Sequence, residues 1–159
     1  MTYILMAVMA VLILVADQLT KWLTVVNIPL YHDVSVLPGI VGLTYVQNDG
    51  AAFSLLEGQQ WVFAVVFAIF AAFIIWEFSK KRLPFSTFER FCIVAVFAGG
   101  LGNMIDRLRL GYVIDMIETK FMNFPIFNVA YCFITCGGIA LVAHLVFFNK
   151  EFWKDEKKK

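Results

Sequence analysis

Long apolar runs separated by short polar segments dominate this chain. Residues 4–16 and 61–76 contain no charged side chain, and two further apolar stretches follow them. A helix needs about 20 predominantly apolar residues to cross a bilayer. The pattern therefore predicts four transmembrane helices, over residues 2–23, 61–78, 88–108 and 127–148. We expect them to form one integral membrane domain covering residues 1–159.

Residues 27–60 follow a different pattern. Prolines and glycines interrupt this segment, and short β-type stretches occur at residues 34–37 and 43–46. These features predict a small, curved antiparallel sheet between the first two spans. Its open edges cannot face lipid, so it must lie in the headgroup region or against protein. The expected fold class is an all-α membrane protein with a small extracytoplasmic sheet. A further strand-like segment, YVIDMI, follows Gly111.

Composition supports a membrane protein. The chain is 61% hydrophobic and its mean hydropathy is +0.79, whereas a soluble domain is about 45–50% apolar. The net charge of +1 and the lack of a nucleic-acid motif argue against a nucleic-acid partner. The first apolar run could be a secretory signal, but no Lys or Arg precedes it and no small-residue cleavage site follows cleanly. A first transmembrane helix is the preferred interpretation.

Basic residues predict the orientation. Nine of the 13 lysines and arginines lie in the loop after the second span, at the start of the third, or in the C-terminal tail. Cytoplasmic segments are enriched in basic residues, so both termini are expected in the cytoplasm. The predicted sheet then lies at the outer face. The following polar residues gather there with it: Asp17, Lys21, Asn48, Asn103, Asp106, Arg107, Asp115 and Asn128.

Ionisable residues in a membrane segment each cost about 2.5–3.5 kcal/mol at the bilayer centre, so a function is expected for them. No Ser/His or Cys/His arrangement occurs on this side, because His144 is expected at the opposite interface and no serine motif surrounds His32. Cys92, Cys132 and Cys136 lie in apolar runs and predict neither a disulfide framework nor a metal site.

After these exclusions, the polar residues of the predicted site point to chemistry carried out by carboxylates. Two aspartates that share a site split their pKa values, so that one acts as a base and the other as an acid, and together they activate water. Asp115 is the better candidate because it lies on a short strand after a turn, with no cation beside it. Asp106 and Arg107 are expected to form a structural ion pair. Asp17 and Lys21, four residues apart on one helix face, predict a second pair, with Lys21 extending to the interface as the simplest alternative.

Five motifs occur in an order that resembles lipoprotein signal peptidase (signal peptidase II), a bacterial inner-membrane aspartic endopeptidase family. They are D-x-x-T-K at residues 17–21, Q-N-x-G-A-A-F at 47–53, G-G-x-G-N-x-x-D-R at 99–107, V-I-D at 113–115 and F-N-x-A at 127–130. The resemblance covers essentially the whole chain.

The resemblance implies an enzyme that removes the signal peptide of lipid-modified prolipoproteins, just before the diacylglyceryl cysteine. It implies two catalytic aspartates, no metal or cofactor, inhibition by globomycin-type peptides, and contact with membrane lipid. We expect a monomer. By the same resemblance, Asn48, Asn103 and Asn128 orient the catalytic groups and the scissile backbone. Asp17, Lys21, Gly50, Asp106 and Arg107 support the site.

One position departs from the family pattern. Asp115 matches the first catalytic aspartate, but the residue after the F-N-x-A motif, where the second aspartate belongs, is Tyr131. A phenol has an ordinary pKa of about 10 and cannot replace a carboxylate base at neutral pH. It is also larger and is expected to fill the place of the catalytic water. Glu118 is the nearest substitute, but three residues along a strand it points to the opposite face from Asp115.

Three hypotheses follow. The chain is a signal peptidase whose activity Tyr131 impairs, or a catalytically silent relative that binds signal peptides or lipoproteins without cleavage. The third hypothesis, ranked last, is a small transporter that uses intramembrane aspartates as proton sites. A transporter is expected to spread polar residues through the depth of the bilayer, whereas here they are predicted at one side.

Overall fold

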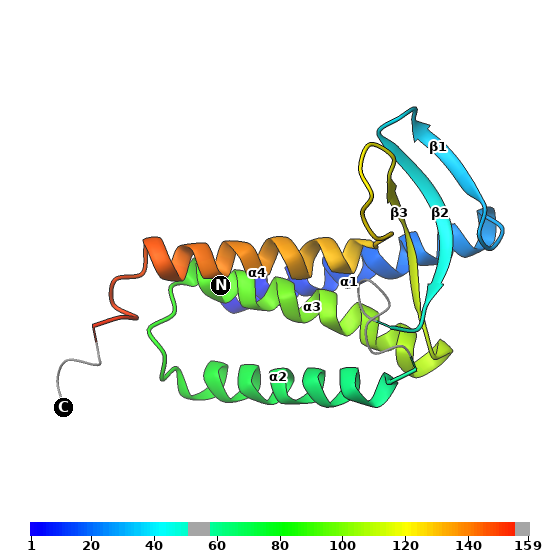
Figure 1. Ribbon diagram of the computed structural model, residues 1–159. Coiled ribbons are helices and arrows are strands. Elements are labelled where there is room, and N and C mark those ends of the chain that lie inside the picture. Colours follow the sequence, from blue (N-terminus) through cyan, green and yellow to red (C-terminus); the bar gives the residue numbers. More distant parts are fainter. Residues whose placement is uncertain (51–57, 155–159) are drawn as a thin grey trace.

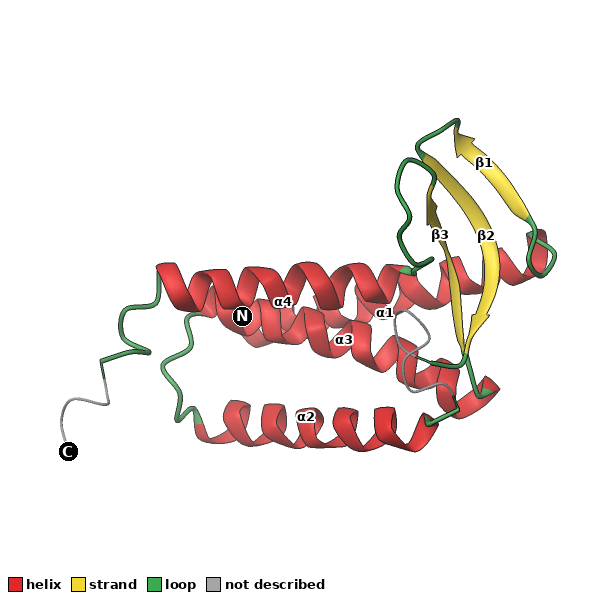
Figure 2. Cartoon of the chain, in the orientation of Figure 1, coloured by secondary structure: helices red, strands yellow, loops and turns green. Residues whose placement is uncertain are grey.

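The computed structural model describes residues 1–50 and 58–154 and contains four long helices and a three-stranded sheet (Figures 1 and 2). The helices are α1 (Thr2–Asn27), α2 (Gln60–Lys80), α3 (Thr87–Leu110) and α4 (Val129–Phe147). By length and composition, all four are able to cross a membrane. The sheet projects from one end of the helix bundle, here named the sheet end, and the C-terminal tail leaves the opposite end, the tail end (Figure 1).

The sheet confirms the predicted strands and adds a third. Strands β1 (Asp33–Leu37) and β2 (Val41–Asn48) pair antiparallel, and β3 (Val113–Thr119) pairs antiparallel with the other edge of β2. The third strand is the YVIDMI segment, so the sheet is built from both sheet-end connections rather than only from the segment between the first two helices. Ile28, Tyr45, Ile114 and Met116 form the small core that packs beneath it.

Helix α1 continues four residues beyond its predicted end. The side chains of Thr20, Thr24 and Asn27 each donate to a backbone carbonyl of the preceding turn, which satisfies these polar groups within the helix. The helix ends before Ile28, which is extended. Pro29 follows, and a residue that precedes proline disfavours helical backbone.

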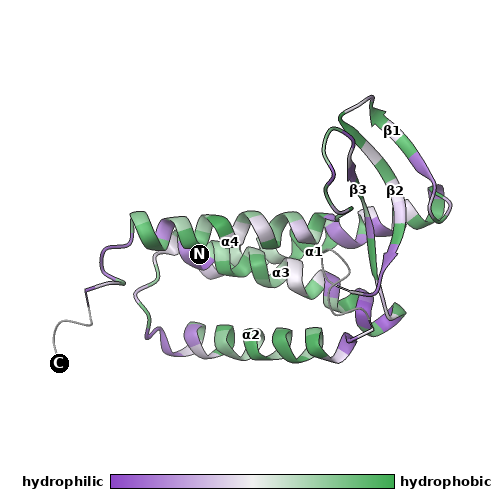
Figure 3. Ribbon diagram, in the orientation of Figure 1, coloured by the Kyte–Doolittle hydropathy of each residue, from purple (hydrophilic) through white to green (hydrophobic). Residues whose placement is uncertain are grey.

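Helix α3 is the centre of the bundle and packs against each of the other helices. Its first turn has a capping box, in which Ser86 accepts from the Glu89 amide and Glu89 accepts from the Ser86 amide. It ends at Gly111, whose φ of 83° suits glycine. Helix α2 lies to one side, is hydrophobic between its polar ends (Figure 3), and has one buried side chain, Glu77.

Candidate functional site

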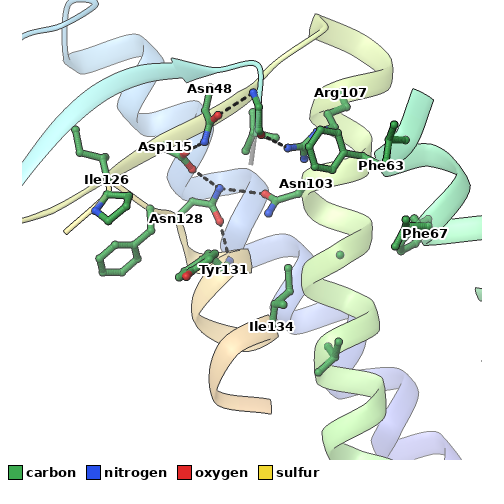
Figure 4. Close-up of a pocket in the computed structure, with 18 of the residues that line it drawn as sticks. Asn48, Phe63, Phe67, Asn103, Arg107, Asp115, Ile126, Asn128, Tyr131 and Ile134 are labelled. Atoms are coloured by element: carbon green, nitrogen blue, oxygen red, sulfur yellow. Dashed lines mark hydrogen bonds between the residues drawn. The ribbon is translucent and has the colours of Figure 1, made fainter. Parts of the chain in front are cut away.

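A cavity of about 520 Å³ lies at the sheet end between α2, α3 and α4. Most of its lining is apolar and includes Phe63, Phe67 and Phe70 of α2 and Ile134 of α4 (Figure 4). The polar lining comes from several elements that are distant in the sequence. These polar residues are Asn48, Asn103, Arg107, Asp115, Asn128 and Tyr131. An apolar cavity with a few convergent polar groups is the usual form of a ligand site.

Asp115 lies on β3 and is 5% exposed. Asn48 Nδ2 donates to its Oδ2 at 2.8 Å, and Asn128 Nδ2 donates to its Oδ1 at 2.7 Å (Figure 4). Each asparagine is oriented by its own carbonyl oxygen, which accepts from the Gly50 amide or the Tyr131 amide respectively. The two amide donors therefore hold the carboxylate in one orientation.

Burial raises the pKa of Asp115 to about 6. The hydrogen bonds from Asn48 and Asn128 and the charges of Lys21 and Arg107 favour the ionised carboxylate, but they only partly offset the loss of hydration. A carboxyl group whose pKa is this close to neutrality is suited to proton transfer.

Asn128 connects Asp115 to a second group of polar residues. Its Nδ2 lies 3.0 Å from Asn103 Oδ1, which also accepts from Lys21 Nζ at 2.9 Å. Lys21 Nζ makes ion pairs of 2.8 Å with both Asp17 and Asp106. We name Asp17, Lys21, Asn103, Asp106 and Asn128 the sheet-end network.

Four members of the sheet-end network are buried, Asp17, Lys21, Asp106 and Asn128, and this corrects the alternative prediction for Lys21. Its side chain is 2% exposed and does not extend to the interface, and Asp17 is 0% exposed. Asp17 Oδ1 accepts from the Ala130 amide at 2.9 Å, so this carboxylate joins α1 to the first turn of α4. A negative charge is favourable at a helix N-terminus.

Close helix approach makes these contacts possible. A Cβ atom on Gly102 would lie 2.5 Å from Asp17 Oδ2, and one on Gly99 would lie 2.5 Å from the Ala130 carbonyl oxygen. Small residues let membrane helices come this near to one another. The two glycines of α3 therefore leave space for the carboxylate on α1 and for the start of α4.

The predicted ion pair between Asp106 and Arg107 is wrong. Asp106 points toward α1 and β3, where Lys21 and the Ile114 amide contact it. Arg107 points into the cavity, donates to the Gly50 carbonyl oxygen at 2.8 Å, and stacks on Phe63. Adjacent helical residues diverge by about 100°, so two such side chains find different partners.

Tyr131 lines the cavity in the first turn of α4. Its ring packs against Phe127, with the centroids 6.0 Å apart. Among the described residues, no hydrogen bond joins its hydroxyl group to Asp115, although the two residues share the cavity (Figure 4). The expectation that the ring fills the place of a catalytic water stays a prediction.

Glu118 does not line the cavity with Asp115. Its Oε2 pairs with Lys120 Nζ at 2.7 Å, and Lys120 also pairs with Asp33 of β1. Glu118 is thus directed to the exposed part of the sheet, as its strand position predicts. Ala51, Ala52 and Phe53 of the second motif lie outside the described residues.

In the described part of the chain, no group of three or more His, Cys, Asp or Glu side chains is arranged to hold a metal ion. The three cysteines are unpaired.

Several contacts at the site were not predicted from the sequence. Gln18 Nε2 lies within hydrogen-bond distance of Asp17, Asp106 and the Gly102 carbonyl oxygen. Its position beside Asp17 is the only signal for these contacts in the sequence. In the sequence, Phe63 is one of many apolar residues of the second span, and nothing near it indicates a contact with Arg107.

A second polar cluster lies at the tail end. Glu89 is 0% exposed and accepts from Asn149 Nδ2 at 2.7 Å and from the Ser86 amide, while His144 Nδ1 lies 2.8 Å from its other oxygen. We name Ser86, Glu89, His144 and Asn149 the tail-end cluster. His144 is thus not simply an interfacial residue, because it pairs with a buried carboxylate.

Comparisons with known proteins agree with this architecture. A family profile of signal peptidase (SPase) II matches residues 9–147. The lipoprotein signal peptidase of Streptococcus pyogenes serotype M2 is 43% identical over 150 residues, covering 94% of this chain and 93% of that protein. The lipoprotein signal peptidase of Latilactobacillus sakei is 45% identical over 143 residues, covering 90% of this chain and 94% of that protein.

Two solved structures of bacterial membrane enzymes have the same fold. One has a TM-score of 0.82 and 30% identity, and its alignment covers 97% of this chain and 92% of that chain. The other has a TM-score of 0.81 and 31% identity, with coverage of 91% and 94%. The extent of these matches shows that this chain belongs to the signal peptidase II family of aspartic peptidases.

Proposed function

We propose that this chain binds the signal peptides of lipid-modified prolipoproteins and that Tyr131 impairs their cleavage. The protein acts as a monomer in the bacterial plasma membrane, with both termini in the cytoplasm and the cavity at the outer face. The family match, the four apolar helices and the distribution of basic residues support this proposal. Of the two catalytic aspartates in the family pattern, this chain keeps Asp115.

One observation carries the proposal of impaired cleavage. Among the described residues that line the cavity, Asp115 is the only carboxylate. Aspartic peptidase chemistry uses two carboxyl groups with different pKa values, one to take a proton from water and one to give a proton to the substrate. Asp115 is oriented for one of these roles, but the position on α4 for the other role holds a tyrosine.

The test is cleavage of a diacylglyceryl-modified prolipoprotein by this chain and by its Tyr131→Asp variant. We expect the variant to be faster by about 100-fold or more, because the two members of a catalytic pair act as a unit. Adding Asp115→Asn to Tyr131→Asp should remove the gain. Equal turnover by the parent and by Tyr131→Asp would contradict the assignment of Tyr131 to the second catalytic position.

A catalytically silent binding protein is the second candidate function. The intact apolar cavity, combined with a single carboxylate, favours it. This candidate predicts that the parent chain binds the prolipoprotein or globomycin with an affinity close to that of Tyr131→Asp, yet yields no product. Slow but measurable cleavage by the parent would instead identify an impaired peptidase.

A proton transporter is supported less well. The charged residues of α3 lie at its two ends, and residues 91–102 between them contain no ionisable side chain other than Cys92. A proton path across the membrane would need titratable groups at intermediate depth.

A further inference from the structure

Arg107 is the only cation among the described residues that line the cavity. Its Nη2 donates to the Gly50 carbonyl oxygen at 2.8 Å. Within the described part of the chain, its Nε atom is buried and has no hydrogen-bond partner. No carboxylate among the described residues forms an ion pair with it, although Asp115 lines the same cavity. The guanidinium group thus lies at the cavity wall with at least one N–H that no described residue accepts.

The face of Phe63 holds this guanidinium group in place. The Arg107 Cζ atom lies 4.1 Å from the centroid of the Phe63 ring, well within the range of a cation–π contact (Figure 4). Such a contact is stronger when both partners are desolvated. The ring has no polar atom, and its contact with Arg107 connects it to the polar lining of the cavity.

Phe63 also connects the sheet end of α2 to α3, two helices that few other side-chain contacts join. Helix α2 buries only Glu77, near the tail end, where Glu77 pairs with Arg90 of α3 at 3.1 Å. In the middle of α2, Phe67 stacks on Phe97. The Phe63 contact lies one turn closer to the sheet end. It therefore joins the cavity-lining part of α2 to Arg107.

We propose that Phe63 is a positioning residue for substrate binding: its ring holds the Arg107 guanidinium group in the cavity wall and ties the sheet end of α2 to α3. Arg107, held in this way, donates to a backbone carbonyl oxygen of the bound peptide. This inference rests on the proposed function, because the ligand is taken to be a lipid-modified signal peptide.

The activity test uses the Tyr131→Asp background and a diacylglyceryl-modified prolipoprotein. Phe63→Leu should raise KM about tenfold with kcat changed less than about twofold, because the guanidinium group is no longer held before binding. Phe63→Trp should keep KM within about threefold of its background, because indole also binds a cation on its face. Phe70→Leu is the control for lost apolar contact with the substrate, and its KM should rise less than that of Phe63→Leu, because Phe70 lines the same cavity on the same helix without a contact to a guanidinium group.

A distance measurement tests the contact without any substrate. Spin labels at Trp61→Cys and Leu108→Cys, both at exposed positions at the sheet end, report the separation of α2 and α3 after the native cysteines are replaced by alanine. Phe63→Leu should broaden the distance distribution, and Phe70→Leu and Phe63→Trp should leave it unchanged.

The proposal requires both results. An unchanged distance distribution in Phe63→Leu would overturn the tie between the helices. An unchanged KM, or an equal rise of KM in Phe70→Leu, would overturn the role of Phe63 in positioning Arg107. If neither the parent nor Tyr131→Asp binds or cleaves the prolipoprotein, the proposed function and the positioning role fail together, while the distance distribution still decides whether Phe63 ties α2 to α3.

Discussion

Two buried polar clusters lie at opposite ends of the same helix bundle, and they differ in what surrounds them. The sheet-end network surrounds Lys21, which pairs with Asp17 and Asp106. The tail-end cluster surrounds Glu89, whose two oxygens are contacted by His144, Asn149 and the Ser86 amide. Both clusters join α3 to α4, so both stabilise the bundle.

Only the sheet-end network reaches the cavity. Asn103 and Asn128 belong to it and line the cavity beside Asp115, whereas no residue of the tail-end cluster lines the cavity. At the tail end every oxygen of the buried carboxylate is contacted within the protein. Buried polar groups therefore do not by themselves indicate a catalytic site. A contact with space that a ligand can enter distinguishes the two clusters.

Removing the central cation of the sheet-end network should have the largest effect on stability. Lys21→Met leaves Asp17 and Asp106 buried without their cation, and breaking a buried pair in this way costs about 3–5 kcal/mol. Thermal unfolding in detergent, compared with exposed Lys150→Met as the control, measures the loss. Equal unfolding temperatures for the two variants would show that the network contributes nothing to stability.

The second largest effect should be the dependence of protein stability on pH that the titration of Asp115 causes. Its pKa is about 6 in the folded protein, against 3.8 for the ordinary group, so the folded state binds this proton more tightly than the unfolded state. The contribution of Asp115 to stability therefore falls as the pH rises from about 4 to about 6, by at most about 3 kcal/mol.

Unfolding of the parent and of Asp115→Ala at pH 4 and pH 7.5 measures this change. Relative to the parent, Asp115→Ala should be more stable at pH 7.5 than at pH 4. Asp33→Ala is the control, because a hydrogen bond from Lys120 lowers the pKa of exposed Asp33 and its titration lies below this window. A difference between parent and Asp115→Ala that does not change with pH would contradict the raised pKa.

Helix spacing at the sheet end should be sensitive to one methyl group. In Gly102→Ala the new Cβ would meet Asp17 Oδ2, a buried atom that Lys21 already contacts, and such overpacking costs about 1–3 kcal/mol. Gly138→Ala on α4 is the matched control, because among the described residues no more distant part of the chain lies within 4 Å of the position that its new methyl group would take. If both variants unfold at the same temperature, close approach of α1 and α3 is not required.

The tail-end cluster should give the smallest effect and one confined to stability. Asn149→Ala removes the amide donor to Glu89 and should cost about 1–2 kcal/mol. In the Tyr131→Asp background the same change should leave KM and kcat for the prolipoprotein unchanged. A change in either kinetic constant would show that the two ends of the bundle are coupled.

Much of the architecture could be predicted from local sequence, because the length and composition of an apolar run are enough to identify it as a span. Observed α2 and α3 agree with their predicted bounds to within two residues. The pairing of β3 with β2 was not predicted, since it joins segments about 70 residues apart. At the site, the motifs identified Asp115, Asn128 and Lys21 as candidate residues, but they did not indicate which side chains contact one another.

Four membrane spans, a polar region at one end of them, and Tyr131 directly after the F-N-x-A motif could be identified from the sequence alone. These follow from residue identity and short-range periodicity. The tertiary structure was needed to show that Asp106 pairs with Lys21 rather than Arg107, that Arg107 stacks on Phe63, and that Glu89 accepts a hydrogen bond from Asn149. Such partners depend on helix rotation and spacing, which arise from packing between distant segments and have no local pattern in the chain.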